Sequence, residues 1–279
     1  MAILKDFKYH SPKTVKEALG LLSRFKKALL LAGGTFVLNH LKKADRVPED
    51  VISLKNIAGL RGIQKAKGVL KIGAMTTIRE VMDSKAIQRD FPSLFDACSQ
   101  LATTPIRNMA TIGGNVASRF FWVDLPAVLL SLDAKLVMAT AISASGKSVG
   151  LDAFLGAKPV KNFVLTHVIL PCEERLAFYF RHTNAMAVDV PCLALAFSCI
   201  RKKNCLTDVR CVVNLAHSHP VRLKSVEVAL EGQDAKIAQS TLKTALEKDL
   251  AVFKLDAYRN QCLRTDVEQL MQRLKDSVS

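Results

Sequence analysis

The predicted strands and helices follow one another in a different order before and after residue 172, which limits the fold classes open to this chain. Up to Pro171, short apolar strands such as residues 28–32 and 50–54 alternate with helical patterns. From residue 172 onward three strand-like stretches precede two helical ones, at residues 175–182, 192–202, 208–217, 234–249 and 256–275. Strands followed by helices in one block indicate a separate α+β domain. The sequence therefore predicts an α+β protein with a domain boundary after residue 171.

Local signals predict where several helices begin and end. Ser11 can cap a helix that has a proline in its first turn, and either Thr76 or Thr77 can cap a later helix. A further helix from Phe91 is expected to end at residues 103–105, Thr-Thr-Pro, because proline disfavours helical geometry in the residue before it.

The first of two glycine pairs, in LLAGGTFVL (residues 30–38), lies between a buried apolar strand and the start of a helix. Paired glycines accept positive φ angles and let a ligand approach the backbone, and the amides at the start of a helix favour an anion. Thr35 could add a hydroxyl donor. A plain turn would leave the same pattern, so this loop alone does not decide between the two interpretations.

The second pair, in Thr111-Ile112-Gly113-Gly114-Asn115, repeats this chemistry with a hydroxyl, two bare amides and a carboxamide. Asp124 follows, just before a possible helix start at Leu125. It either caps that helix or accepts hydrogen bonds from ribose hydroxyls or an adenine amine. Two loops of this kind fit a ligand with a pyrophosphate in its middle.

Other function classes lack their motifs: the chain has no GxGxxG and no HExxH. Its 40 Lys and Arg against 25 Asp and Glu give a net charge of +15. No reading module or stacking aromatics accompany the basic clusters, so we expect no nucleic-acid binding. The positive charge favours an anionic cofactor or an acidic partner.

The seven cysteines form no CxxC pair, and the spacing of Cys192, Cys199, Cys205 and Cys211 does not suit a zinc or iron–sulfur site. We predict no metal site and interpret these residues as small buried thiols in a reducing compartment. The N-terminal residues lack the apolar core of a signal peptide, and no apolar stretch is long enough to span a membrane. A cytoplasmic protein without membrane insertion is expected.

Two segments, LLAGGTFVL and TTPIRNMATIGGNVA…VDLPAVLLSLDA, resemble the flavin-nucleotide motifs of the FAD-binding medium subunits of molybdenum hydroxylases, of the xanthine dehydrogenase and carbon monoxide dehydrogenase type. SPKTVKEALGLL, LKIGAMTTIREV and AYRNQCLRTDVEQLM extend the resemblance over nearly the whole chain. It implies an FAD-binding fold of two α+β subdomains, vanillyl-alcohol-oxidase-like, and a C-terminal domain with a three-stranded antiparallel sheet and helices. The implied domains are residues 1–55, 56–171 and 172–279.

The resemblance also implies which residues bind FAD. The first loop would wrap the pyrophosphate and the second loop would hold its other side, while one aspartate contacts the adenosine and two later residues lie near the flavin. In chain order these residues are Leu31, Ala32, Gly33, Gly34, Thr35, Phe36, Val37, Thr111, Gly113, Gly114, Asn115, Asp124, Leu165 and Arg181. No catalytic side chain is assigned, because placement and electrostatics are the protein's share of flavin chemistry.

By the same resemblance, the chain is an electron-transfer subunit of an oxidoreductase. Its partners would be a large subunit with the molybdenum cofactor and a small 2Fe-2S subunit, and FAD would pass electrons to NAD⁺ or another acceptor. Phe36, Phe120 and Phe121 depart from the family pattern, as does Phe163, which lies near the place of a family acidic residue. The first three substitutions motivate an alternative, an FAD-free assembly or scaffold paralogue of the same fold. A basic nucleic-acid binder, retained on DNA or RNA in a salt-sensitive way, is a third hypothesis.

Overall fold

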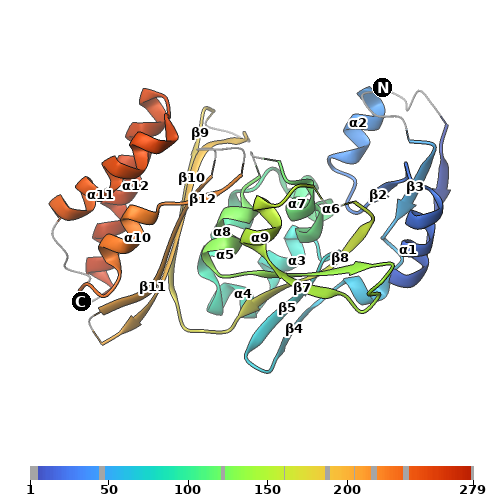
Figure 1. Cartoon of the computed structure of the whole chain (residues 1–279), viewed down its shortest axis with the longest axis horizontal. Coiled ribbons are helices and arrows are strands. Elements are labelled where there is room, and N and C mark those ends of the chain that lie inside the picture. The colour runs from blue at the N-terminus through green and yellow to red at the C-terminus, as the bar shows by residue number, and fades with distance from the viewer. Residues whose placement is uncertain are drawn as a thin grey trace. The chain divides into compact units, whose positions relative to one another are not determined.

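The computed structural model describes residues 6–43, 48–120, 123–159, 161–185, 189–203, 205–214, 219–234 and 239–277. The chain forms two compact units, and each combines segments that are separate in the sequence (Figure 1). Unit 1 consists of Met1–Ser84, Thr103–Ser118 and Ala134–Pro171. Unit 2 consists of Lys85–Ala102, Arg119–Asp133 and Cys172–Ser279. The division into three domains at residues 55 and 171 stays a prediction.

Unit 1 contains two sheets. A three-stranded sheet has the order β1-β3-β2 with parallel pairing, and a five-stranded antiparallel sheet has the order β4-β5-β8-β6-β7. The strands are β1 (Lys8–His10), β2 (Leu29–Leu31), β3 (Asp50–Ser53), β4 (Ile63–Ala66), β5 (Val69–Gly73), β6 (Lys135–Thr140), β7 (Lys147–Gly150) and β8 (Phe163–Pro171). The helices are α1 (Val15–Arg24), α2 (Val37–Lys43), the 3₁₀ turn η1 (Ala58–Leu60), α3 (Ile78–Asp83), α6 (Thr104–Met109), α7 (Ile112–Ser118) and α9 (Leu151–Gly156).

The amphipathic helix α1 joins the two sheets of unit 1 in one core. Its apolar face contributes Leu19 and Leu22, which pack in one cluster with Ile52 of β3, Ala139 of β6 and Val164 of β8. Because β3 is the central strand of its sheet, all four of its residues are buried. This core supports the end of β2, from which the first glycine loop leaves.

Unit 2 is built on one antiparallel sheet of order β12-β11-β10-β9. Its strands are β9 (Leu176–Thr183), β10 (Pro191–Lys202), β11 (Cys205–Asn214) and β12 (Val221–Arg222). Its helices are α4 (Lys85–Asp90), α5 (Pro92–Gln100), α8 (Leu125–Ser131), α10 (Lys224–Leu230), α11 (Gln239–Phe253) and α12 (Ala257–Asp276). The predicted α+β class is confirmed, but the sheet has a fourth strand because the two-residue β12 is too short to show a period in the sequence.

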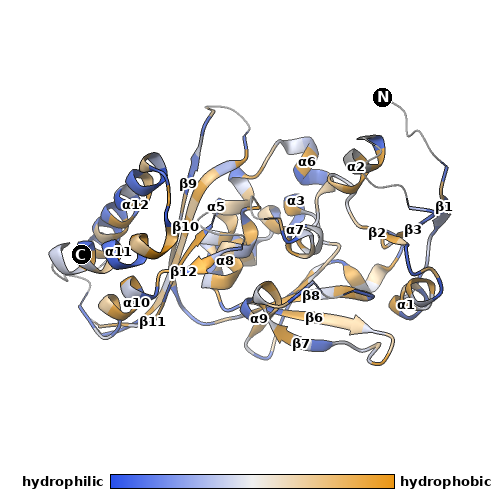
Figure 2. Ribbon diagram, turned by 45° about the horizontal axis from the view of Figure 1, so that its top comes forward, coloured by the Kyte–Doolittle hydropathy of each residue, from blue (hydrophilic) through white to orange (hydrophobic). Residues whose placement is uncertain are grey.

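The central strand β10 is buried on both faces, with its first nine residues all excluded from solvent. Leu195 and Phe197 pack with Leu263 and Leu270 of α12 on one face. On the other face, Ser198 donates a hydrogen bond to the last residue of α8. Figure 2 shows the result, a largely hydrophobic β10 beside an α12 with long hydrophilic stretches. Such two-sided burial explains the nearly continuous apolar run in this strand.

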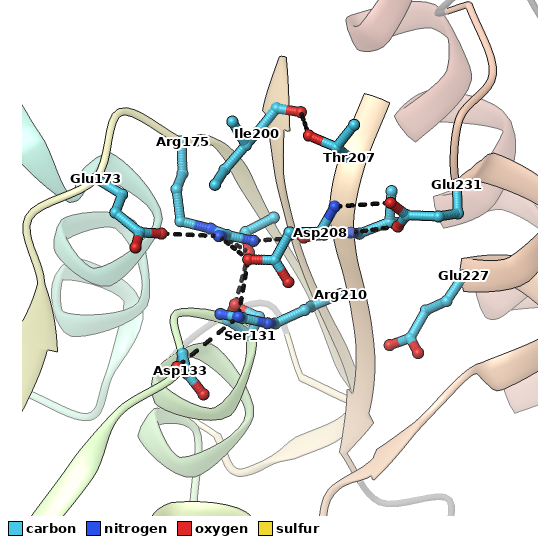
Figure 3. A network of polar contacts seen from close by, with 12 residues as sticks. Ser131, Asp133, Glu173, Arg175, Ile200, Thr207, Asp208, Arg210, Glu227 and Glu231 are labelled. Carbon is cyan, nitrogen blue, oxygen red and sulfur yellow. Dashed lines mark hydrogen bonds and ion pairs between the residues drawn. The ribbon is translucent and has the colours of Figure 1, made fainter. Parts of the chain in front are cut away.

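An arginine just before β9 links this strand to two others of the sheet (Figure 3). The side chain of Arg175 is 4% exposed and donates to Ser198 Oγ at 3.1 Å, to Asp208 Oδ2 at 2.6 Å and to Asp208 O at 2.6 Å. Arg210 adds a bond of 2.8 Å to the same carboxylate and approaches Asp133 after α8. This network connects the start of β9, the end of β10 and the start of β11 to the segment that carries α8.

No helix among the described residues is both long enough and apolar enough to cross a membrane.

Candidate cofactor site

The first glycine loop connects the end of β2 to the start of α2. Gly34 has a φ angle of +79°, a backbone conformation that glycine adopts at little cost and other residues rarely adopt. Its carbonyl accepts a hydrogen bond from Leu38 N at 2.9 Å, which begins the helix. Within the described part of the chain, the backbone amides of Gly33 and Gly34 donate no hydrogen bond. Both amides can therefore donate to an anion.

The second loop differs from the prediction, because its glycine amides are already paired. Gly113 N donates to Ala74 O at 2.9 Å, and Gly114 N donates to Thr111 Oγ1 at 3.1 Å. A Cβ atom at Gly113 would lie 2.5 Å from the Ala74 Cβ, so close packing inside unit 1 requires glycine there. The expectation of two bare amides is wrong. The groups that can face a ligand are the Thr111 hydroxyl hydrogen and the Asn115 side chain.

The two loops lie against each other in unit 1. A Cβ atom at Gly33 would be 1.9 Å from the carbonyl oxygen of Met109, which ends α6 just before the second loop. A Cβ atom at Gly114 would be 3.7 Å from the Cβ of Ala32 in the first loop. Two segments far apart in the sequence are thus brought together, as a ligand held by both of them requires.

Asn115 supplies the best test of whether a polar ligand fits this place. Its Oδ1 atom is buried and has no hydrogen-bond partner in the described structure. A buried polar atom without a partner costs about 1–3 kcal/mol, so such atoms in native proteins call for a ligand or water. Asn115 Oδ1 can accept from a hydroxyl group of a ligand, whereas the two donor amides of the first loop and the Thr111 hydroxyl can donate to phosphate oxygens. Together these groups fit a phosphate-bearing cofactor.

Asp124 precedes α8 in unit 2 and does not act as a helix cap, since its side chain makes no cap hydrogen bond. Instead its Oδ1 accepts a bond of 2.7 Å from Tyr179 Oη and one of 2.8 Å from Arg181 Nε. Burial raises the pKa of the Asp124 carboxyl, and Arg181 and Tyr179 act in the opposite direction. The structure thus brings together two of the predicted residues, Asp124 and Arg181.

Tyr179 was not predicted from the sequence. It lies two residues before Arg181 on β9, so the two side chains share one face of the strand. The spacing of two residues between Tyr179 and Arg181 on a predicted strand is the sequence signal that could have identified Tyr179. Arg181 is further occupied by a bond of 2.6 Å from its Nη2 to Asp189 O.

The other predicted residues occupy varied environments. Leu165 is 5% exposed in β8, paired with Met138 of β6 in the five-stranded sheet. Leu31 ends β2, Val37 begins α2, and Thr35 and Phe36 form the turn between them. Phe120 is partly exposed, whereas Phe121 lies outside the described residues.

The cysteines form no disulfide among the described residues. All seven are free, and Cys192, Cys199 and Cys211 are buried as expected, but Cys205 is exposed at the edge of a turn. Among the described residues, no three His, Cys, Asp or Glu side chains gather where they could hold a metal ion.

Known proteins resemble this chain over most of its length. The xanthine dehydrogenase FAD-binding subunit of Escherichia coli O157:H7 is 28% identical over 250 residues, which cover 87% of this chain and 84% of that protein. The carbon monoxide dehydrogenase medium chain of Hydrogenophaga pseudoflava is 37% identical over 133 residues, 47% of this chain and 46% of that one. A solved structure of carbon monoxide dehydrogenase from the same organism matches with a TM-score of 0.87 at 25% identity, covering 96% of both chains.

Residues 5–173, which include both glycine loops, match the family described as the FAD binding domain in molybdopterin dehydrogenase. This match covers more than half of the chain and both of its candidate phosphate-binding segments. The chain therefore belongs to that family and is an oxidoreductase subunit with FAD as its cofactor.

Proposed function

We propose that this protein is the electron-transfer subunit of a cytoplasmic molybdenum hydroxylase. Its partners would be a large subunit with the molybdenum cofactor and a small 2Fe-2S subunit, and its electrons would go to NAD⁺ or another acceptor. Support comes from relatives named as the FAD-binding subunit of xanthine dehydrogenase and the medium chain of carbon monoxide dehydrogenase. When bound, FAD accepts electrons and can release a pair of them as hydride.

In this proposal the two glycine loops hold the pyrophosphate. The amides of Gly33 and Gly34 donate to its oxygens, because within the described structure they have no other acceptor. Thr111 Oγ1 accepts from Gly114 N and keeps its own hydrogen for a phosphate oxygen. Hydrogen bonds to a charged oxygen contribute about 1.5–3 kcal/mol each, so several donors acting together can retain the cofactor.

The net charge acts in the same direction as these donors. A pyrophosphate brings two negative charges, and a chain with a net charge of +15 attracts an anion from solution. In this proposal Asp124 contacts the adenosine, where its carboxylate can accept from ribose hydroxyls.

The observation that carries the loop assignment is the pair of Gly33 and Gly34 amides without an acceptor in the described structure, beside a second loop in which the buried Oδ1 of Asn115 also lacks a partner. It is tested by Asn115→Asp, which keeps the shape of the side chain and adds a negative charge beside the pyrophosphate. We expect the purified variant to lose most of its flavin absorbance while unfolding at about the same denaturant concentration as the wild type.

Asn56→Asp is the matched control, because it makes the same change in charge on the same unit. Asn56 is exposed, and its side chain donates to Ser11 Oγ at 2.8 Å. This variant should retain its flavin. If Asn115→Asp kept as much FAD as Asn56→Asp, the second loop would not be a phosphate-binding segment.

The partners and the acceptor need a separate experiment. Purification from the native source, followed by analysis of metals and cofactors, should recover molybdenum, iron and sulfide in the same complex as this chain. Adding NADH to that complex should bleach the flavin if NAD⁺ is the acceptor. A chain that purifies alone, with flavin but without molybdenum or iron, would contradict the proposed role.

A further inference from the structure

We infer that Tyr179 is a positioning residue for FAD: its hydroxyl, with Arg181, fixes the Asp124 carboxylate in the orientation that contacts the adenosine half. The inference rests on the proposed contact of Asp124 with FAD. It concerns only side chains of unit 2 and assigns a role to a residue that no sequence motif singles out.

The first argument is the burial of the Tyr179 hydroxyl. Tyr179 is 4% exposed, and its Oη donates to Asp124 Oδ1 at 2.7 Å. A buried hydroxyl is costly unless it is hydrogen-bonded, and a phenylalanine would fill the same space without that requirement. The bond to Asp124 is therefore what the hydroxyl contributes at this position.

The second argument is the geometry at the carboxylate. Both the Tyr179 and the Arg181 bond end on Oδ1, and they approach from the same strand. Two donors on one oxygen fix the rotation of the carboxylate and leave Oδ2 as the oxygen that can accept from a ligand. Arg181 is itself held by its bond to Asp189 O, so the donor set is preorganised.

The third argument is electrostatic. Asp124 is buried, and burial works against the charged form, while Arg181 and then Tyr179 favour it. Among the described residues, Cys98 on α5 is a further titratable group beside Tyr179. Burial together with the neighbouring Asp124 raises the pKa of Tyr179 well above its ordinary value, so the phenol keeps its proton and remains a donor. Arg181 and Tyr179 thus favour the carboxylate form of Asp124, which accepts hydrogen bonds.

The test is a double-mutant cycle on the full chain, with Tyr179→Phe, Asp124→Asn and both together. After removal of the flavin, each protein is titrated with FAD. Tyr179→Phe alone should weaken binding about tenfold, the scale of one hydrogen bond to a charged group. In the Asp124→Asn background the same change should have little further effect, because a positioning residue acts only through the group it positions. Equal effects in both backgrounds would overturn the inference.

Two further readouts separate positioning from a merely structural role. FMN lacks the adenosine half, so Tyr179→Phe should leave FMN affinity unchanged. FAD affinity should fall at low pH, where Asp124 becomes protonated. In this variant the fall should begin at a higher pH than in the wild type, because loss of the Tyr179 donor raises the pKa of Asp124. An equal loss of FMN binding, or an unmoved pH profile, would count against positioning.

Tyr258→Phe is the control, since it removes a hydroxyl from the same unit at a residue that is 56% exposed. It should bind FAD like the wild type, and a tenfold loss there would overturn the assignment to Tyr179. These equilibrium measurements do not depend on electron transfer. A wild type that binds FAD but takes no electrons from a partner would refute the proposed function and leave this inference standing.

Discussion

Gly33 lies against the backbone of Met109, so closely that a Cβ atom at position 33 would be 1.9 Å from the Met109 carbonyl oxygen. No side chain fits into that distance. The contact holds the first glycine loop against the segment that leads into the second loop. Glycine at this position is therefore explained by packing between two segments of unit 1.

The substitution Gly33→Ala should destabilise unit 1 and release the flavin as a consequence. Overpacking of this kind costs about 1–3 kcal/mol or more, because the obstacle is backbone and cannot rotate away. Denaturant unfolding should show a lower midpoint. The control is Gly156→Ala in α9, where nothing lies within 4 Å of the added Cβ atom and stability should be kept. Equal midpoints for the two variants would disprove the contact.

Much of the fold follows from local signals that the sequence displays. Thr77 caps α3 in a reciprocal capping box with Glu80, one of the two caps that we predicted, because both partners lie within one turn. The first helix starts later than predicted. Thr14, not Ser11, accepts the hydrogen bond from Glu17 N, while Ser11 Oγ accepts from Asn56. Both residues can cap, and the glutamate three positions after Thr14 decides between them.

The elements that the sequence did not reveal depend on contacts or are too short to show a period. The Thr-Thr-Pro segment ends no helix; it begins α6, with proline in the first turn. α10 has seven residues and was absent from the predicted helices. Likewise, the amide of Gly113 is paired with Ala74 only because the chain folds back on itself. The glycine loops could be predicted from local pattern, but which of their amides remain open could not.

Gly34→Ala should cost about 1–2 kcal/mol of stability, because a residue with a Cβ atom is strained at the φ angle of +79° found there. Gly20→Ala should do the opposite. Gly20 lies inside α1, nothing lies within 4 Å of an added Cβ atom, and alanine favours a helix by about 0.5–1 kcal/mol over glycine. Thermal unfolding of the two variants should thus shift in opposite directions, and a shift of the same sign would contradict this reading.

Arg175→Met should destabilise unit 2, since it removes three close hydrogen bonds from a buried guanidinium. The loss of charged hydrogen bonds predicts about 1.5–3 kcal/mol. Arg79→Met is the control. Its side chain is 47% exposed and pairs with Asp83 on the surface of α3, where such pairs contribute at most about 1 kcal/mol. Denaturant titration would contradict the prediction if both variants changed stability equally.

Asp266 on α12 predicts a dependence of stability on pH. Its Oδ1 lies 2.7 Å from His182 Nε2, while its Oδ2 is buried without a partner in the described structure. Burial raises the pKa of Asp266 from 3.8 to about 6, although His182 opposes the shift. Between pH 3.8 and about pH 6, Asp266 binds a proton in the folded protein but not in the unfolded chain. This group therefore adds stability as the pH falls from about 6 toward 4, and disfavours the folded state above pH 6.

Asp266→Asn removes this titration. Relative to the wild type, the variant should be most stable above about pH 6 and should lose that advantage toward pH 4. His167, whose pKa burial and Lys71 lower to about 4, titrates in both proteins and cancels in the difference. Asp276→Asn, which removes an exposed carboxylate from the same helix, is the control variant. Parallel pH profiles for Asp266→Asn and the wild type would show that the buried carboxylate does not titrate as its surroundings require.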